Sequence, residues 1–472
     1  MGSEWREVEF GKLCSIRRGA SPRPIQDWIV PDGMPWVKIS DATSSGSRYI
    51  EETGEFIKWE GESKSFRVYP GDLILSNSAT PGIPKLMSID ACVHDGWLIL
   101  REFNGLDKTF AFYLLLNERQ SIVSQGNGSV FTNLKTDILK SHRVSIPNLD
   151  TQRRIAAILS AFDDKIELNR RMSRTLEQMA RALFKSWFVD FDPVRAKMRG
   201  EMPEGMDAET AALFPDEMEE VEGREVPRGW EWKSLAEVTS FLNRGVTPKY
   251  VEQGGMLVLN QKCIRDLKID YCKARRHSAE KAVAFDKIIQ VGDVLVNSTG
   301  TGTLGRVAQV LSLPETSTID THVTIVRANA EVVISSYFGV FLETREGEIE
   351  ALGVGSTGQT ELSRTALGSL PFLLPSQRLQ KAFHKEVDRL RQLSDRNDYE
   401  SARLAQLRDS LLPRLLSGEV DVSAWAEAES ITERLDAVYA SEESRLSAGV
   451  RALSDEALLQ AQGRAWSDGG GS

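Results

Sequence analysis

Two long stretches of the chain share one hydrophobic pattern, and each is followed by a segment with helical spacing. Short runs that alternate apolar and polar residues, bounded by Gly, Pro, Asn and Ser, predominate over residues 1–150 and again over 231–375. Such runs are typical of β-strands joined by turns. We therefore predict an α+β fold with two mostly β domains and a few short helices, among them one over 109–122.

One predicted strand occurs twice in nearly the same form. "VYPGDLILSNS" at 68–78 and "IQVGDVLVNST" at 289–299 both place a Gly-Asp turn before a short apolar run. The ends of the two domains also match, as "VSIPNLDTQRRI" at 144–155 and "FLLPSQRLQKAF" at 372–383. Self-similarity over such a distance indicates an internal repeat. We predict that the second β domain is a diverged copy of the first.

After each β domain, the spacing of apolar residues changes from two to alternating three and four. This heptad spacing predicts long amphipathic helices over 151–189 and 376–417. Each seam residue of the second helix lies 228 residues after its counterpart in the first. The predicted coiled-coil seam consists of Ile155, Phe162, Asn169, Leu176 and Leu183 in the first helix, and of Phe383, Leu390, Asn397, Leu404 and Leu411 in the second.

The asparagine that both seams share suggests how the helices pair. Asn169 and Asn397 lie near the centres of their seams, so an antiparallel pair would bring them together. A buried polar pair of this kind fixes register and orientation in coiled coils. Alternatively, each asparagine is a solvated interruption of its seam. The predicted architecture is an antiparallel coiled coil with pseudo-twofold symmetry, in which each helix follows one β domain.

Charge is distributed unevenly along the chain. The net charge is −10, and most of the acidic excess lies in residues 190–230 and 418–472. We interpret the first, which contains several prolines, as an acidic linker, and the second as an acidic tail that is partly helical or disordered. The two predicted long helices are positively charged and the β domains are close to neutral. Binding to a polyanion such as DNA therefore remains open.

Length and composition indicate a cytoplasmic protein with more than one domain. The chain has 472 residues, which exceeds the size of a single hydrophobic core. The first residues lack the pattern of a signal peptide, and no apolar run reaches the length of a membrane span. The four cysteines show no CxxC spacing, which favours free thiols in a reducing cytoplasm.

Several motifs together resemble the specificity subunit of Type I restriction–modification systems. These are "WVKISD", "PGDLILS", "VGDVLVNSTGTGTLGRVA", "IPNLDTQRRIAAILSAFDDKIELNRR" and "LRDSLLPRLLSGEV". The resemblance covers about residues 1–417. It implies that 1–150 and 231–375 are target recognition domains, each of which reads one half of a bipartite, asymmetric sequence in double-stranded DNA. The helices would then set the gap between the halves and dock two methyltransferase subunits. Two restriction (motor-nuclease) subunits would complete the assembly.

The same resemblance implies a subunit without catalytic activity. S-adenosylmethionine, ATP and magnesium are then expected on the partner subunits, with no cofactor and no metal in this chain. The sequence contains no Asn/Asp-Pro-Pro-aromatic motif for methylation of amino groups. The expected role is DNA recognition and assembly in defence against phage.

Two other functions were weighed. The chain could be a coiled-coil adaptor whose β domains bind proteins, or a single-chain metal-dependent nuclease. Asp32, Glu62 and Lys64 are residue types that nucleases use around a divalent cation, but the second half has no counterpart. His94 and His322 lack clustered partners, so packing or polar surface is the expected role of both.

One glycine motif could be mistaken for a dinucleotide site. "GTGTLG" at 300–305 matches GxGxxG and follows a strand. A dinucleotide site needs a helix to begin there, whereas "RVAQVLSL" alternates like a strand. We predict a hairpin turn.

Candidate DNA-binding residues are polar or basic and lie next to strand ends. Such side chains suit phosphates and base edges, although Asn77 and Ser78 could equally cap a turn. The first-domain candidates are Arg17, Arg18, Lys38, Ser40, Asn77, Ser78 and Lys85. The second-domain candidates are Arg244, Lys249, Asn260, Gln261, Lys262, Asn297, Ser298, Thr299 and Arg306.

Overall fold

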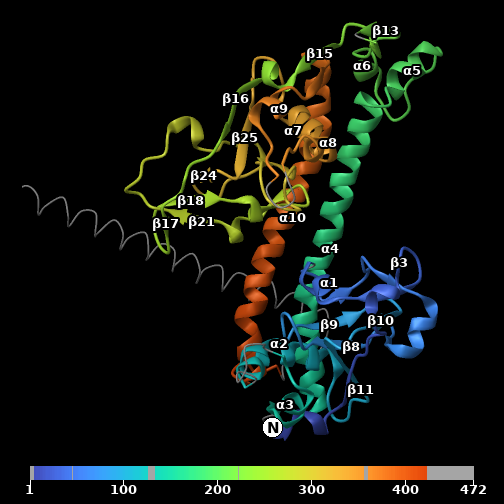
Figure 1. Cartoon of the computed structure of the whole chain (residues 1–472), viewed down its shortest axis with the longest axis vertical. Coiled ribbons are helices and arrows are strands. Elements are labelled where there is room, and N and C mark those ends of the chain that lie inside the picture. Colours follow the sequence, from blue (N-terminus) through green and yellow to red (C-terminus); the bar gives the residue numbers. More distant parts are fainter. Residues whose placement is uncertain (1–4, 45, 126–132, 222, 356–359, 423–472) are drawn as a thin grey trace, which may run out of the picture. The chain divides into compact units, whose positions relative to one another are not determined.

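The computed structural model describes residues 5–44, 46–125, 133–221, 223–355 and 360–422 (Figure 1). The chain divides into two compact units. The first contains residues 1–169 and 400–472, and the second contains 170–399. Helices and sheets are mixed within each unit, which confirms the predicted α+β class. The boundary between the units falls within both long helices, so the units differ from the predicted domains. The predicted domain limits therefore remain predictions.

The β domain of the first unit is built on two five-stranded sheets. Their strand orders are β3-β6-β4-β10-β7 and β2-β11-β8-β9-β5. The strands of the first sheet are, in that order, Ile29–Val30, Phe56–Ile57, Met34–Val37, Ala91–Val93 and Phe66–Val68. Those of the second are Ser15–Arg18, Trp97–Arg101, Leu73–Ser76, Pro84–Met87 and Tyr49–Ile50.

The β domain of the second unit has the same strand connections in two four-stranded sheets. Their orders are β17-β21-β18-β24 and β16-β25-β22-β23. The parallel pair β4 with β10 corresponds to the parallel pair β18 with β24, and the first domain has a further parallel pair, β5 with β9. The predicted duplication is therefore present in the topology. The strands are Tyr250–Val251, Arg275–His277, Met256–Leu259 and Ser317–Ile319, then Thr239–Arg244, Val323–Ala328, Val294–Asn297 and Val307–Gln309.

A further strand pair closes each domain next to its long helix. The pairs are β1 (Arg6–Glu9) with β12 (Arg143–Ile146), and β15 (Glu231–Ser234) with β26 (Pro371–Leu374). A buried helix accompanies each domain, α2 (Lys108–Ser124) in the first and α7 (Ser335–Thr344) in the second. Helix α2 confirms the helix predicted over 109–122. The short α-helices of the described β domains are α1 (Ile39–Ser44), α3 (Thr136–Ser141), α8 (Glu346–Ala351) and α9 (Arg364–Gly368), and short 3-10 helices such as Gln261–Cys263 accompany them.

The repeated Gly-Asp motif is a turn that requires glycine. Gly71 and Gly292 have φ angles of 88° and 96°, a region that residues with a Cβ rarely adopt. The Gly71 N–H donates to the Met87 carbonyl at 2.7 Å, and the Gly292 N–H donates to the Val310 carbonyl at 2.8 Å. The motif thus begins strands β8 and β22 at one fixed place in each sheet.

The aspartate of the motif binds an arginine on the neighbouring strand. The Asp72 carboxylate accepts two hydrogen bonds from the Arg101 guanidinium at the end of β11, one of them 3.1 Å long from Nε. The Asp293 carboxylate accepts two from Arg327 in β25, from Nε at 2.7 Å and from Nη2 at 2.8 Å. Bidentate pairs of this kind fix geometry as well as charge. The repeat is therefore a structural element that joins β8 to β11 and β22 to β25.

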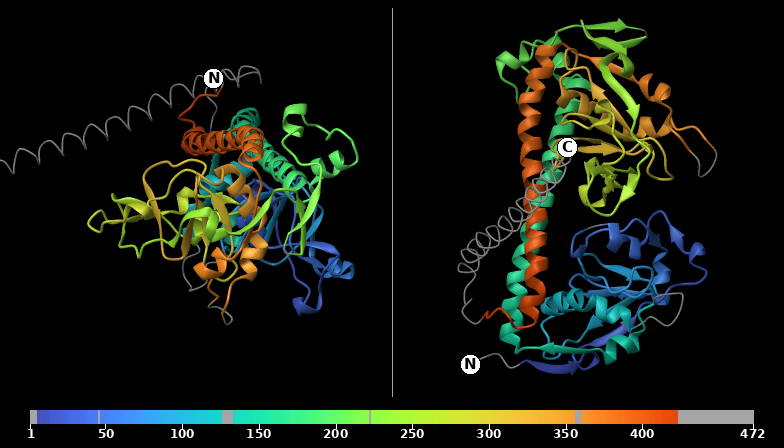
Figure 2. Two further views of the ribbon diagram at one scale, coloured as in Figure 1. Left: turned by 90° about the horizontal axis from the view of Figure 1, so that it is seen from above. Right: turned by 90° about the vertical axis from the view of Figure 1, so that its left-hand side faces the viewer.

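The two longest helices in the described part of the chain are α4 (Leu149–Phe188) and α10 (Gln377–Leu416), of 40 residues each. Figure 1 and Figure 2 show α4 in green and α10 in orange. At ~1.5 Å per residue, each is about 60 Å long. None of the helices in the described residues is long and apolar enough to cross a membrane.

Contacts within each unit show that α4 and α10 run antiparallel. In the first unit, Arg408 of α10 pairs with Asp163 of α4, and Asn169 Nδ2 donates to Glu400 Oε2 at 2.8 Å. Residue numbers rise along one helix as they fall along the other. In the second unit, Ser173 bonds to Asp398 and Glu177 bonds to Ser394 in the same order.

None of the ten predicted seam residues is exposed. Seven are buried, and Leu176, Leu183 and Leu390 are partly buried. Asn169 is 1% exposed and Asn397 is 7% exposed, so neither is a solvated interruption of its seam. The hydrogen-bond partner of Asn169 is Glu400 in its own unit. The predicted contact between Asn169 and Asn397 concerns residues of different units and remains a prediction.

The segment interpreted as an acidic linker contains folded elements. They are α5 (Asp192–Met198), α6 (Ala208–Ala211) and the hairpin β13–β14 (Met218–Val221 and Arg224–Pro227). Phe214 and Val226 are buried in the core of the second unit, and Phe214 contacts Trp187 of α4 with ring centroids 5.1 Å apart. The sequence does not predict this burial, because acidic residues separate the few apolar residues of the segment. Of the predicted tail, residues 423–472 lie outside the described part.

We predict that the two Asp–Arg pairs contribute unequally to stability. The Asp293 side chain is 1% exposed and its partner Arg327 is 17% exposed, whereas Asp72 and Arg101 are 16% and 32% exposed. Removing one partner of a buried pair costs about 3–5 kcal/mol, because the other charge stays buried. Asp293→Asn should therefore lower the free energy of unfolding by about 3 kcal/mol and Asp72→Asn by less, as measured by denaturant unfolding. Equal losses would contradict this account of the pairs.

Candidate nucleic-acid interface

Polar residues gather at the carboxyl ends of four strands in the first β domain. Arg18 ends β2, and its Nε donates to the Asp95 carbonyl at 2.7 Å. Asn77 follows β8, and its Nδ2 donates to the same carbonyl at 3.1 Å. Asp95 itself follows β10, and Lys38 follows β4. Loops from both sheets therefore meet at Asp95.

A cleft of about 760 Å³ lies at these strand ends. Of the predicted residues, Lys38, Ser40 and Ser78 line it, and the buried ring of Trp36 contributes apolar surface. The other polar side chains of its lining are Ser21, Arg23, Gln26, His94 and Asp95. A cleft with apolar walls and a few convergent polar groups is typical of a binding site.

Arg23, Gln26 and Asp95 were not among the predicted site residues. The first two lie in the loop after Gly19, where no strand marks the position. A usable signal was the glycine shared by "RRGASP" and "NRGVTP". A Cβ on Gly19 would lie 2.1 Å from the His94 carbonyl oxygen, and one on Gly245 would lie 2.0 Å from the Ile319 carbonyl oxygen. The repeated glycine thus marks the place where this loop crosses the neighbouring strand end.

Asp95 organises the charges around the cleft. Its Oδ1 accepts from the Ser21 hydroxyl at 2.9 Å, and its Oδ2 lies 3.4 Å from Arg23 Nη2 and 3.7 Å from Arg18 Nη2. Burial raises the pKa of Asp95, but the Ser21 hydrogen bond and the two arginines outweigh burial and lower that pKa. The carboxylate is therefore ionised at neutral pH and holds two exposed arginines loosely.

His94 contributes a hydrogen-bond acceptor rather than a charge. Burial lowers the pKa of His94, and its Nδ1 lies 2.9 Å from the Gly96 N–H. A neutral ring that accepts this bond keeps its other nitrogen protonated. Packing, the role expected from the sequence, agrees with the 6.0 Å between the ring centroids of His94 and Trp36.

The second β domain brings polar residues together at the corresponding strand ends. Asn297 ends β22, and its Nδ2 donates to the carbonyl of Gln261 at 3.0 Å. Gln261 lies in the short helix after β18, between the predicted residues Asn260 and Lys262. Thr299 Oγ1 lies 2.7 Å from Nδ1 of His322, which comes from the loop after β24. Ends of β18, β22 and β24 therefore form one polar cluster.

Some predicted residues in these clusters are buried. Asn77, Asn297 and Ser298 are at most 3% exposed. Ser298 Oγ lies 2.6 Å from Thr324 Oγ1. These three side chains hold the loops together, whereas Gln261 and Thr299 are half-buried and Lys262 is exposed. The accessible members are therefore the ones suited to contact a ligand directly.

The remaining predicted residues lie outside the two polar clusters or are engaged elsewhere. Arg244 ends β16 and donates to the Leu362 carbonyl at 2.9 Å, and Arg306 donates to the Gly302 carbonyl at 2.8 Å. Lys249 pairs with Glu280 at 2.6 Å. Lys85 is buried and donates to the Ser47 carbonyl. Arg17 is exposed at the end of β2.

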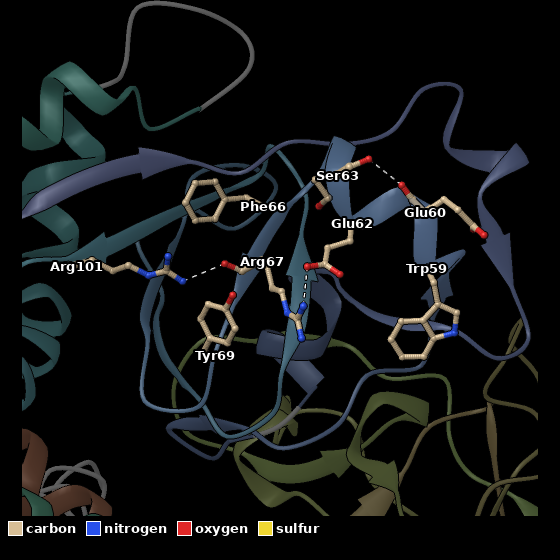
Figure 3. Close-up of a pocket in the computed structure, with 9 residues that line it drawn as sticks. Trp59, Glu60, Glu62, Ser63, Phe66, Arg67, Tyr69 and Arg101 are labelled. Carbon is tan, nitrogen blue, oxygen red and sulfur yellow. Dashed lines mark hydrogen bonds and ion pairs between the residues drawn. The ribbon is translucent and has the colours of Figure 1, made fainter.

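A second cleft in the first unit, of about 550 Å³, contains none of the predicted DNA-binding residues (Figure 3). Its floor is Arg67, whose Nη1 donates to Glu62 at 2.6 Å and whose guanidinium also binds Asp90. Arg101 Nη2 donates to the Arg67 carbonyl at 3.0 Å. Both guanidinium groups lie over the Tyr69 ring, at 5.4 and 5.5 Å. The charged groups of this cleft are therefore largely paired with one another.

One residue of the nuclease alternative is engaged in an ion pair. Glu62, one of its candidate ligands, binds Arg67. In the described ranges, no three His, Cys, Asp or Glu side chains are grouped as metal ligands would be. Residues 300–305 join the antiparallel strands β22 and β23, which confirms the predicted hairpin turn.

The sequence matches one protein family. The profile described as "Type I restriction modification DNA specificity domain" matches residues 2–178. The specificity subunit of the Type I restriction enzyme HindI from Haemophilus influenzae is 26% identical over 89% of this chain and 100% of its own length. That of the MjaIX enzyme from Methanocaldococcus jannaschii is 23% identical over 89% of this chain and 94% of its own length.

A solved structure shares the fold. The S subunit of a Type I restriction–modification system from M. genitalium superimposes with a TM-score of 0.50 and 16% identity. The match covers 88% of this chain and 96% of that one.

Exposed and buried members of the second cluster should respond differently to substitution. Lys262→Ala should leave thermal stability unchanged and weaken DNA binding on all sequences alike. If Lys262 contacts a phosphate, the slope of log K against log salt should fall by about 1. Asn297→Ala should instead lower the melting temperature, because it removes the buried hydrogen bond to Gln261. Loss of stability in the Lys262 variant, or none in the Asn297 variant, would contradict these assignments.

Proposed function

Because the chain belongs to the DNA specificity subunits of Type I restriction–modification systems, we propose that it reads a bipartite, asymmetric DNA sequence. Each β domain would read one half. In this proposal the chain supplies recognition and assembly, and the methyltransferase and restriction subunits supply the chemistry. S-adenosylmethionine, ATP and magnesium would then act on those partners.

The observation that carries this proposal is that corresponding strand ends present different polar side chains in the two domains. The Gly-Asp turn and its arginine are retained, as Asp72–Arg101 and Asp293–Arg327. The loops that follow β8 and β22 differ, "SNSATPG" against "NSTGTGTLG". A shared scaffold with divergent loops is what two readers of different half-sites require.

The accessible side chains divide by the contacts for which they are suited. Arg17, Arg18 and Lys262 are exposed cations and would bind phosphates, which give affinity and register. Gln26 and Gln261 carry amides at the two polar clusters, and an amide pairs with adenine through two hydrogen bonds. We assign the contacts with bases to the amides, and the contacts with the phosphates of the DNA backbone to the cations.

The long helices would dock two methyltransferase subunits and set the gap between the half-sites. Because α4 ends in the core of the second unit and α10 ends in that of the first, each unit contains parts of both helices. Two restriction subunits would join this assembly. The adaptor alternative shares the helices but predicts no DNA preference.

We expect sequence-specific, salt-sensitive binding by the purified complex of this chain with its methyltransferase subunits. Competition binding at 50 and 200 mM salt would compare a duplex that carries the target with one in which it is scrambled. The target should bind at least 10³-fold more tightly, and both affinities should fall with salt. Equal affinity for the two duplexes would overturn the proposal and favour the adaptor.

Each domain should specify only its own half-site. Replacing residues 1–150 with the corresponding domain of another specificity subunit should change one half of the methylated sequence and leave the other intact. The matched exchange of 231–375 should change the opposite half. Sequencing that locates methylated bases would identify the methylated sequence after each exchange. A change in both halves after either exchange would refute modular reading.

A further inference from the structure

One lysine connects the second β domain to both long helices. Lys268 begins β20 (Lys268–Ile269), which forms a hairpin with β19 (Ile264–Arg265). Its Nζ lies 2.9 Å from a carboxylate oxygen of Glu177 on α4 and 2.7 Å from one of Asp398 on α10. All of these residues belong to the second unit. A single ammonium group therefore bridges the domain and the two helices.

The two carboxylates are held in place by serines of the helix pair. Ser173 Oγ donates to Asp398 Oδ1 at 3.2 Å, and Ser394 Oγ donates to Glu177 Oε1 at 3.3 Å. Ser173 is fully buried and Ser394 is nearly so. Each serine lies on the helix opposite its carboxylate, so the acceptors of Lys268 are fixed relative to both helices.

Lys268 remains charged in this position. Burial acts to lower the pKa of Lys268, but the carboxylates of Asp398 and Glu177 more than offset burial and raise that pKa. The side chain is therefore an ammonium ion at neutral pH, with opposite charges on either side. Without it, the two carboxylates would repel each other across the helix pair.

The backbone that presents Lys268 is strained. Asp266 and Leu267, at the tip of the hairpin, have φ angles of 52° and 60°. The left-handed conformation costs roughly 1–2 kcal/mol for a residue with a Cβ, and such strain persists where surrounding contacts hold it. The hairpin is thus held in a specific conformation next to the helices.

The first β domain is attached in a different way. Arg48, just before β5, pairs with Asp164 of α4, and its Nη1 lies 3.1 Å from the Tyr113 hydroxyl. The Asp164 side chain is 64% exposed. The Tyr113 hydroxyl of α2 donates to Asp163 Oδ2 of α4 at 2.6 Å, and Asp163 also pairs with Arg408 of α10. The first domain therefore reaches both long helices through several side chains. Both β domains are thus attached to the two long helices, and in the second domain one side chain, that of Lys268, makes the bridge alone.

We propose that Lys268 is a positioning residue that fixes the second recognition domain on the helix pair and so determines which gap length between half-sites is accepted. This inference rests on the proposed function. Successive base pairs of DNA are ~3.4 Å apart. A displacement of the reading loops by that distance would therefore shift recognition by one base pair, without altering any side chain that contacts a base.

The test uses the complex of the full chain with its methyltransferase subunits. Methylation rates would be measured on duplexes that keep both half-sites and carry the natural gap or a gap one base pair shorter or longer. For Lys268→Met, the preference for the natural gap should fall at least tenfold relative to wild type. The bases required in each half-site should stay the same. Lys268→Arg should restore much of the preference, because it keeps the charge.

Lys273→Met serves as the matched control. Lys273 lies in the same domain and pairs with Asp270 at 2.8 Å on the surface. Its removal should leave the gap preference unchanged. Asp398→Asn tests the same bridge from the helix side, should Lys268→Met not fold, and should also reduce the preference.

Two results overturn the inference. If folded Lys268→Met keeps the gap preference within twofold of wild type, Lys268 does not position the domain. If it methylates every duplex more slowly by the same factor, its role is only structural. A wild-type complex that binds target and scrambled duplexes equally would instead refute the proposed function, and that result does not depend on any Lys268 variant.

Discussion

The Asp–Arg pair on the Gly-Asp turn is the constraint on which each β domain depends. Asp293 and Arg327 join β22 to β25, and Asp72 and Arg101 join β8 to β11. A bidentate bond allows little freedom to the strands that it connects. Because the loops "SNSATPG" and "NSTGTGTLG" begin four residues after Asp72 and Asp293, their starting points are fixed while their sequences are free to differ. Under the proposed function, this arrangement would let one fold serve two half-sites.

The helices impose a second constraint of a different kind. Their seams are largely apolar, and the polar residues within them are buried in hydrogen bonds, such as that between Asn169 and Glu400. Polar seam residues reduce stability but restrict register. If the helices set the gap between two half-sites, as proposed, a fixed register matters more to that role than maximal stability. The charged contacts of Arg48 and Lys268 connect each β domain to the long helices within its own unit.

Local patterns allowed much of this to be predicted from the sequence. Period-two runs, the Gly-Asp repeat and the heptads each act over a few residues, so the strands, α2 and the seam could be inferred. Contacts between distant residues could not. Asp95 gathers Arg18, Asn77 and Ser21 only in the folded domain, and no local pattern distinguishes it. Asn77 and Asn297 were predicted as readers because strand ends attract polar residues, but the structure buries both. The folded elements within 190–230 could not be inferred, because charged residues outnumber the few apolar residues that pack against the core.

The central claim is that the chain directs methylation to one bipartite DNA sequence. Mapping methylated bases across the genome of the host, with and without this chain, tests it most directly. The account predicts that an asymmetric motif of two short blocks, separated by a constant number of unspecified base pairs, is methylated only when the chain is present. An unchanged methylation pattern, or a chain-dependent motif that is a single continuous block, would contradict it.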